Sequence, residues 1–326
     1  MPYALDILSG AQHAAVTNAR ATDDYFHEGA GDPPQWAIGA ASILYWALGI
    51  LPFKDGFYSS THAQVGGQTV GPELRPQREI LMATLSTAMV GPMDGIGLLN
   101  KTRVMSSCRA DGVILKPDQP LTTVDECFRA APGQTPEPAW CFIFHTFSDV
   151  PLTASSIHGT ASVGAIDAYR AHYWFSDEPR PLQPRMIYLP PEAAAEGHYV
   201  VYDWHSGRVQ RLQPAGTSLD PSYEGFVYGV VVPSFRGMVL LGEVDKLVPL
   251  SSLRFKHVAL ATPSKPAGLE VTIRGVANET VRVCAAAEEA RDAAFTSWVT
   301  HCTAASFGTP GEQTIVFTAA GADLVH

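Results

Sequence analysis

The spacing of apolar residues indicates that the first half of the chain alternates between helical and strand-like segments. The expected helices cover residues 4–11, 37–49 and 98–108, and the expected strands cover 14–18, the second half of 81–90, and 140–147. Such alternation is typical of parallel strands joined by crossover helices. The first half therefore predicts an α/β architecture.

After about residue 185 the pattern changes to short alternating strands, most of which are separated by Gly, Pro and Ser. The expected strands cover 199–204, 208–212, 226–232, 238–242, 269–273, 280–284 and 314–317. This pattern is typical of an antiparallel β-sandwich. A Pro-containing segment at 180–184 marks the expected boundary, which divides the chain into residues 1–184 and 185–326. Residues 148–175 fit neither pattern.

Composition and charge argue against nucleic acid and a membrane as partners of the chain. The 326 residues are 46% apolar and 17% charged, with a formal net charge of −10, which describes a globular chain with a sizeable core. No cluster of Lys and Arg occurs, so nucleic acid is not an expected partner. Residues 36–53 are uncharged and almost long enough to span a bilayer. Because Gly39, Gly49 and Pro52 interrupt this run, we expect a buried helix and no membrane partner.

The cysteines indicate whether the chain contains disulfides or a zinc site, and the first residues indicate its cellular compartment. Five widely spaced cysteines, without a C-x-x-C pair, argue against both a disulfide framework and a zinc site. We expect no metal and no organic cofactor. Residues 1–10 lack the features of a secretory signal, which predicts a cytoplasmic location. Asn100 and Asn278 each begin a glycosylation sequence, which matters only if the chain is secreted.

Two adjacent carboxylates, Asp23 and Asp24, follow the first expected strand and are the catalytic candidates. Neighbouring carboxylates suit acid–base chemistry, because proximity and partial burial raise the pKa of at least one of them. The same pair also suits an ordinary helix cap or a solvated loop. Both interpretations stay open on these residues alone.

Residues near this pair supply possible contacts to a ligand. An aromatic such as Trp36 can stack on a sugar face, although an aromatic in an apolar helix more often belongs to the core. Asp55 and Asp94 can accept hydrogen bonds from sugar hydroxyls, but aspartates are also common in turns. The candidate binding residues are Arg20, Trp36, Asp55 and Asp94.

Several short motifs occur in the same order as in the raffinose synthase and α-galactosidase family of glycoside hydrolases. Ala21-Thr-Asp-Asp-Tyr25 resembles that family's V-S-D-D-F strand end. Residues 199–255 resemble its closing β domain more loosely. The other motifs are Lys54-Asp-Gly-Phe57 with Ser60 and Thr61, Asp94 after Gly91-Pro92, Asp111-Gly-Val-Ile-Leu115, and Thr123-Val-Asp-Glu-Cys-Phe128.

The resemblance implies the C-terminal portion of an incomplete (β/α)8 TIM barrel, followed by the β-sandwich. It also implies that Asp23 is a general acid/base, supported by Asp24, in hydrolysis or galactosyl transfer on α-galactosides. Retaining chemistry needs a nucleophilic carboxylate about 5–5.5 Å from the acid, and the strand that carries it in the family has no counterpart in this sequence. We therefore expect an incomplete catalytic domain, which is either the C-terminal part of a longer enzyme or a reduced relative that has lost the chemistry. The alternative is a non-catalytic carbohydrate-binding or structural protein. An open barrel also predicts self-association through its unpaired strand edges.

Overall fold

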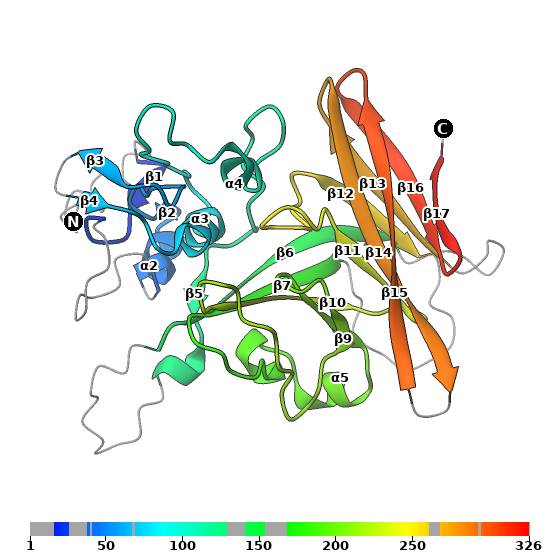
Figure 1. The fold of residues 1–326 in the computed structure, drawn as a ribbon. Helices are drawn as coiled ribbons and strands as arrows, with labels where there is room; N and C mark the ends of the chain where they lie inside the picture. The colour runs from blue at the N-terminus through cyan, green and yellow to red at the C-terminus, as the bar shows by residue number, and fades with distance from the viewer. Residues whose placement is uncertain are drawn as a thin grey trace, which may run out of the picture.

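Ten strands form the largest sheet of this computed structural model (Figure 1). The structure describes residues 16–25, 38–39, 41–66, 69–128, 141–153, 168–260, 268–292 and 295–325. In order across the sheet, the strands are β17 (Gly321–Val325), β16 (Gly311–Thr318), β13 (Gly268–Gly275), β12 (Phe255–Leu260), β6 (Ile143–Thr153), β7 (Ala168–Ser176), β10 (Val227–Pro233), β8 (Tyr199–Asp203) and β9 (Val209–Arg211). The tenth, β5 (Thr122–Thr123), pairs with β6.

The neighbouring strands of this sheet run antiparallel, except for β12 and β6, which are parallel where Val258 lies opposite Leu152. The sequence of strand β10 explains why it is buried on both faces. It is rich in β-branched valine, and all seven of its residues are buried. Tyr228 and Val230 pack into one hydrophobic cluster, whereas Val227 and Val231 pack into another. The period of two therefore places this strand between two apolar layers.

A three-stranded sheet packs against part of the ten-stranded sheet. It consists of β11 (Met238–Gly242), β14 (Glu279–Asp292) and β15 (Phe295–Phe307), in that order. Its inward residues share the largest hydrophobic cluster with β12, β13 and β16 (Figure 1). Gly242 ends β11 with a positive φ of 85°, next to a change of register against β14. A Cβ there would lie 2.2 Å from the Pro249 carbonyl oxygen, so the close approach requires glycine.

The N-terminal part contains two small sheets and most of the helical residues. One small sheet pairs β1 (Asn18–Arg20) in parallel with β2 (Leu51–Phe53), and the other is the hairpin of β3 (Gln64–Gly66) and β4 (Thr69–Gly71). The helices of the described residues are α2 (Ala41–Ala47), α3 (Pro76–Leu85), α4 (Lys101–Met105) and α5 (Pro191–Ala195), with 3-10 turns η1 (Asp125–Phe128) and η2 (Pro184–Ile187).

The strand expected in the second half of residues 81–90 is wrong, because residues 86–90 form a turn and irregular structure. They follow helix α3, which the sequence pattern did not predict. Proline at its first position fixes a helical φ without losing a hydrogen bond, and the helix then runs to Leu85. Nine of its ten residues are buried. Ile80, Leu81 and Met82 pack in the main hydrophobic cluster. A helix buried on all sides has no polar stripe, so its apolar run resembles that of a buried strand.

The expected fold class, an incomplete (β/α)8 TIM barrel followed by a β-sandwich, is wrong. A TIM barrel needs parallel strands that alternate with helices. In the described residues β-structure predominates, and the main sheet is almost entirely antiparallel. Residues 148–175, which fitted no pattern, contribute most of β7 and part of β6 to this sheet. The self-association expected from an open barrel loses its basis with that fold.

The strands predicted after residue 185 are confirmed in position. Each of the seven expected segments overlaps one strand, namely β8, β9, β10, β11, β13, β14 and β16. Strands β12, β15 and β17 were missed. Strands β6 and β7 precede the expected boundary at residue 184, yet they share a sheet with strands that follow it. The division into domains at this point stays a prediction.

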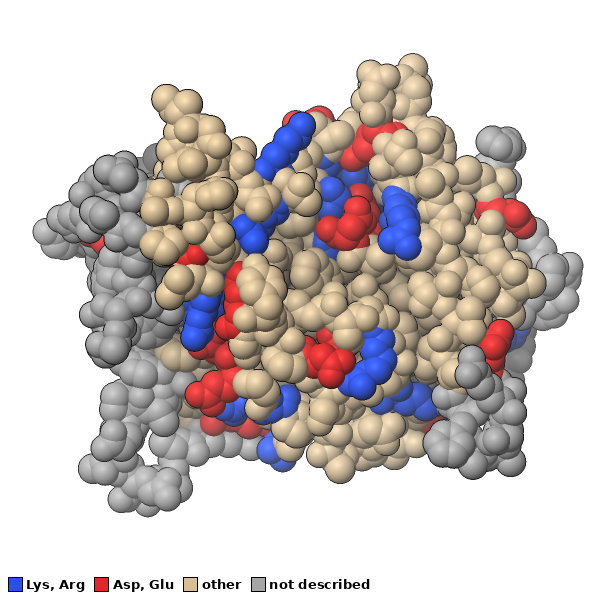
Figure 2. Space-filling view, in the orientation of Figure 1, with Lys and Arg blue, Asp and Glu red and all other residues tan. Residues whose placement is uncertain are grey.

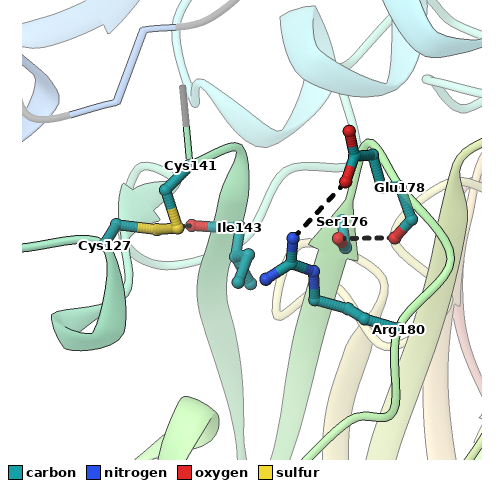
Figure 3. Close-up of a disulfide and its surroundings, with 6 residues drawn as sticks. All are labelled: Cys127, Cys141, Ile143, Ser176, Glu178 and Arg180. Atoms are coloured by element: carbon teal, nitrogen blue, oxygen red, sulfur yellow. Dashed lines mark hydrogen bonds and ion pairs between the residues drawn. A yellow bond between two sulfur atoms is a disulfide. The ribbon is translucent and has the colours of Figure 1, made fainter. Parts of the chain in front are cut away.

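Two disulfides overturn the expectation of a chain without a disulfide framework. Cys127 of η1 is bonded to Cys141, just before β6, and Figure 3 shows this bond beside the Ile143 carbonyl. Cys284 and Cys302 face each other across β14 and β15 and form the second bond. Cys108 is buried and free. Sequence spacing did not reveal these pairs, because the register of β14 and β15 brings Cys284 to Cys302 and the fold of the segment before β6 brings Cys127 to Cys141.

Helix α2 lies within the uncharged run at residues 36–53. It has seven residues and buries only Ser42 and Tyr45, so the expectation of a fully buried helix is wrong. Ile43 and Leu44 are exposed. Among the described helices, none is both long enough and apolar enough to cross a membrane.

Candidate functional site

Three chain segments end side by side in the N-terminal part and carry the predicted polar residues. Strands β1 and β2 run parallel, with Arg20 opposite Phe53. The segment after β2 then forms a parallel bridge from Phe57 to Pro92. Parallel segments present their carboxyl ends at the same edge, where ligands commonly bind in α/β proteins. This edge is the strand-end site, comprising Arg20, Asp23, Asp24, Asp55 and Asp94.

Arg20 joins two of the predicted carboxylates. One of its terminal nitrogens lies 2.6 Å from Asp24 Oδ1, and the other lies 3.1 Å from Asp55 Oδ2. Asp55 also accepts hydrogen bonds from the backbone N–H groups of Tyr25 and Gly56, both at 2.9 Å. These contacts fix the loop after β1 against the loop after β2.

The two catalytic candidates have different surroundings. The Asp24 side chain is 80% exposed and is held by Arg20. Asp23 is also exposed, and no residue in the described part of the chain hydrogen-bonds to its carboxylate or pairs with it. Asp23 is therefore available to a ligand, whereas Asp24 holds the guanidinium of Arg20. The role of both as catalytic residues stays a prediction.

Asp94 holds the backbone after β2. Both of its carboxylate oxygens lie 3.0 Å from the Ser59 backbone nitrogen, which donates to them, and the Ser60 hydroxyl lies 3.4 Å away. Its observed contacts thus order a loop of the strand-end site. Trp36, the remaining binding candidate, lies outside the described residues.

A buried ion pair lies next to the strand-end site and was missed in the sequence. Lys54 follows β2 directly, and its ammonium lies 2.6 Å from Glu79 Oε2 of α3. The two side chains are 0% and 3% exposed. The ammonium also lies 5.1 Å from the centre of the Tyr25 ring and 5.4 Å from that of Phe57. The only sequence signal was a lysine beside Asp55 at the end of an apolar strand.

Tyr25 connects the strand-end site to a second buried carboxyl group. Its hydroxyl donates to Glu73 Oε2, while Glu73 Oε1 accepts from the Arg75 N–H at 2.7 Å. Burial, followed by the negative charge of Glu79, raises the pKa of Glu73. Burial, with the charge of Glu73 next, also raises the pKa of Tyr25. Raised carboxyl pKa values near a strand end are typical of acid–base groups, although structural networks produce them too.

Helix α3 ties this region to the main sheet. The guanidinium of Arg78 lies 3.3 Å from Glu79 and 3.3 Å from Asp177, which follows β7. The Glu224 carboxylate accepts from the backbone N–H groups of Gln77 and Arg78, both at 2.9 Å. Glu224 thus caps the first turn of α3 from a distant part of the chain.

The charges on the visible face of the molecule are mixed. Lys and Arg are interspersed with Asp and Glu in Figure 2. Among the residues that the structure describes, no group of three or more His, Cys, Asp or Glu side chains could hold a metal ion. The polar groups at the strand-end site are carboxylates, a guanidinium and backbone N–H groups.

Comparison with known proteins adds no assignment, because no family model and no curated protein matches the chain.

Proposed function

We propose that the chain binds carbohydrate, of the α-galactoside class, at the strand-end site. The observation that carries the proposal is the exposed carboxylate of Asp23, which has no partner among the described residues and follows the network of Arg20, Asp24 and Asp55. A free carboxylate accepts hydrogen bonds from sugar hydroxyls, and charge-assisted bonds of this kind are stronger than neutral ones. The resemblance of residues 21–25 and 54–57 to motifs of α-galactoside enzymes supports the choice of sugar.

Hydrolysis or galactosyl transfer is the second candidate function. It is favoured by the same free carboxylate, because a general acid must exchange its proton with the leaving oxygen. A retaining mechanism also needs a second available carboxylate. Asp24, Asp55 and Asp94 are each already held by an ion pair or by backbone N–H groups. The geometry therefore supports binding better than catalysis.

Calorimetric titration of the full chain with galactose and raffinose tests the proposal. We expect heat that saturates with raffinose, and no heat with either sugar would contradict carbohydrate binding. An aryl α-galactoside added to the same protein separates the two functions. Release of the aryl alcohol, lost in Asp23→Asn, would establish hydrolysis. Binding without release would leave the chain as a binding protein.

The disulfides bear on where this function operates. We infer that the chain works in an oxidising compartment, because Cys127–Cys141 and Cys284–Cys302 are unlike the reduced thiols of cytosolic proteins. The cytoplasmic location expected from residues 1–10 remains untested. Alkylation of the protein isolated under denaturing conditions from its own cells checks the inference. Cys108 alone should react, and labelling of Cys284 or Cys127 would contradict it.

A further inference from the structure

We propose that Asn278 is an acceptor for an N-linked oligosaccharide. Asn278, Glu279 and Thr280 form the sequence N-x-T, which N-glycosylation requires. Asn278 lies in the turn from β13 into β14, and Glu279 and Thr280 are the first two residues of β14. The side chains of Asn278 and Thr280 are exposed, whereas Glu279 is buried. The turn lies at one end of the two sheets (Figure 1).

The turn is fixed without using the Asn278 side chain. The Asn278 backbone N–H donates to the Phe307 carbonyl at 2.7 Å. Glu279 lies 2.6 Å from a guanidinium nitrogen of Arg254 and accepts from the Val276 N–H at 3.0 Å. Asn278 itself has a φ of 62°, a left-handed conformation that asparagine adopts more readily than most residues. No residue in the described ranges hydrogen-bonds to its side-chain amide, so the amide nitrogen is available.

The other N-x-T sequence, at Asn100, has a different environment. Asn100 is half-buried, and its side chain accepts from the Arg103 N–H at 3.0 Å as the N-cap of α4. Its backbone N–H donates to the Ser59 hydroxyl at 2.9 Å. The side chain of Asn100 thus has a structural task, and Asn100→Gln is a matched control for the sequence motif.

A second observation on the same hairpin points to the compartment where N-glycans are added. The Cys284–Cys302 disulfide joins β14 to β15 only a few residues beyond the turn. Disulfides form and persist in the oxidising secretory pathway. The inference rests on the turn and the disulfides, and it does not depend on the proposed carbohydrate binding.

The modification is a group transfer from a polyprenyl-diphosphate-linked oligosaccharide, catalysed by a separate transferase. The Asn278 Nδ2 atom forms a bond to the anomeric carbon of the first sugar. The bond between that carbon and the diphosphate oxygen breaks, and the polyprenyl diphosphate leaves with the electron pair. One Nδ2 proton passes to a base, and no oxidant or reductant takes part.

Peptide mass analysis of the full chain, secreted from eukaryotic cells behind a cleavable leader, tests the inference. We expect the Asn278 peptide to carry a glycan that an N-glycosidase removes, leaving aspartate at this position. Thr280→Ala should abolish the glycan without changing the residue at the left-handed position. Thr280→Ser should keep it, because serine also completes the sequence.

The control and the contradicting results are read from the same peptide. In Asn100→Gln the glycan on Asn278 should persist. An unmodified Asn278 in the secreted chain with both disulfides intact would overturn the inference, as would a modified Asn278 in Thr280→Ala. Mass analysis without reduction verifies the disulfides in each variant, which separates failed folding from failed modification.

Discussion

At the scale of single residues, the buried ion pair of Lys54 and Glu79 lies next to the strand-end site and carries a large desolvation cost. Removing both charges from water is costly, and a short contact recovers that cost only when both partners are present. Lys54 also lies near the rings of Tyr25 and Phe57, which tightens its packing. The pair therefore fixes the geometry of the segment that carries Asp55.

Removal of one partner should be more harmful than removal of both. We expect Lys54→Met to lower the free energy of unfolding by about 3–5 kcal/mol, because it leaves Glu79 buried without its closest cation. The double variant Lys54→Met with Glu79→Leu should recover part of this loss. Urea denaturation measures both changes.

The exposed pair of Arg274 and Glu312, at 2.9 Å, supplies the control. Arg274→Gln should change the free energy of unfolding by no more than about 0.5 kcal/mol, because water screens exposed pairs. Equal losses in Lys54→Met and Arg274→Gln would contradict a special role for the buried pair.

Glu73 predicts a dependence of stability on pH. Its pKa in the folded chain is raised above the ordinary carboxyl value, first by burial and then by Glu79. The folded state therefore holds this proton more tightly than the unfolded state does. Its contribution to stability is fully present below the ordinary pKa and is lost as the pH rises through the folded pKa.

Glu73→Gln removes this titration. Denaturation midpoints measured in steps from pH 4 upward should fall less steeply in the variant than in the natural chain. Gln is nearly isosteric: its oxygen can accept from the Arg75 N–H while its NH2 donates to the Tyr25 oxygen, so the variant removes the charge and keeps both contacts. Identical slopes in the two proteins would show that Glu73 does not titrate as described.

Sequence reasoning found the residues of the strand-end site and missed the buried carboxyl groups next to it. Arg20, Asp24 and Asp55 were all candidates, and the structure brings them into direct contact. Glu73 and Glu79 were not, because the partners that join them to this region, Tyr25 and Lys54, lie far away in the chain. Contacts of this length depend on topology, which local patterns do not contain.

At the scale of elements, α3 shows how a distant residue completes a helix. The residue before the helix, Arg75, makes no side-chain cap. Glu224 supplies the missing acceptor to Gln77 and Arg78. A carboxylate at this position also interacts favourably with the positive end of the helix dipole.

Glu224→Ala should therefore destabilise the chain by about 1–2 kcal/mol, the usual cost of losing a helix cap. Thermal denaturation followed by circular dichroism measures the loss. Glu178→Ala is the control, because Glu178 is an exposed carboxylate whose nearest cation, Arg180, is 3.7 Å away (Figure 3). A loss in Glu178→Ala as large as in Glu224→Ala would contradict the cap.

The elements predicted correctly and those missed differ in how clearly the sequence marks them as short apolar runs that end at turn residues. Strands β8, β10 and β11 were found because each is a short apolar run that ends at a Gly, Pro or polar turn. Helix α3 was not predicted, because it is buried on almost every side and its sequence shows no polar stripe. Strand β15 was missed because Thr, Ser, Ala and His interrupt its apolar pattern. Its place is set by a long register with β14.

At the scale of the whole molecule, disulfides and buried charges join segments far apart in sequence. Arg254 is buried and contacts Glu243 at 2.9 Å and Glu279 at 2.6 Å, which links β11, β12 and β14. Arg78 and Asp177 link α3 to the end of β7. The expectation of a separate barrel failed because nothing in a local pattern shows that β6 and β7 pair with strands from the second half.

The Cys284–Cys302 disulfide should stabilise the whole chain, because it closes a loop of 18 residues and restricts the unfolded state. We expect Cys284→Ala with Cys302→Ala to cost about 3 kcal/mol in the free energy of unfolding. Guanidinium denaturation under oxidising conditions measures it. In the presence of reductant the natural chain and the variant should converge, and a persistent difference would assign the loss to packing alone.

The central claim is that the Asp23 carboxylate accepts a hydrogen bond from a sugar hydroxyl at the strand-end site. Calorimetric titration of Asp23→Asn with raffinose tests this claim most directly. Since a hydrogen bond to a charged group contributes about 1.5–3 kcal/mol, the dissociation constant should rise at least about tenfold. Asp323→Asn, an exposed change on β17, should bind like the natural chain. Equal affinity in Asp23→Asn and the natural chain would contradict the claim.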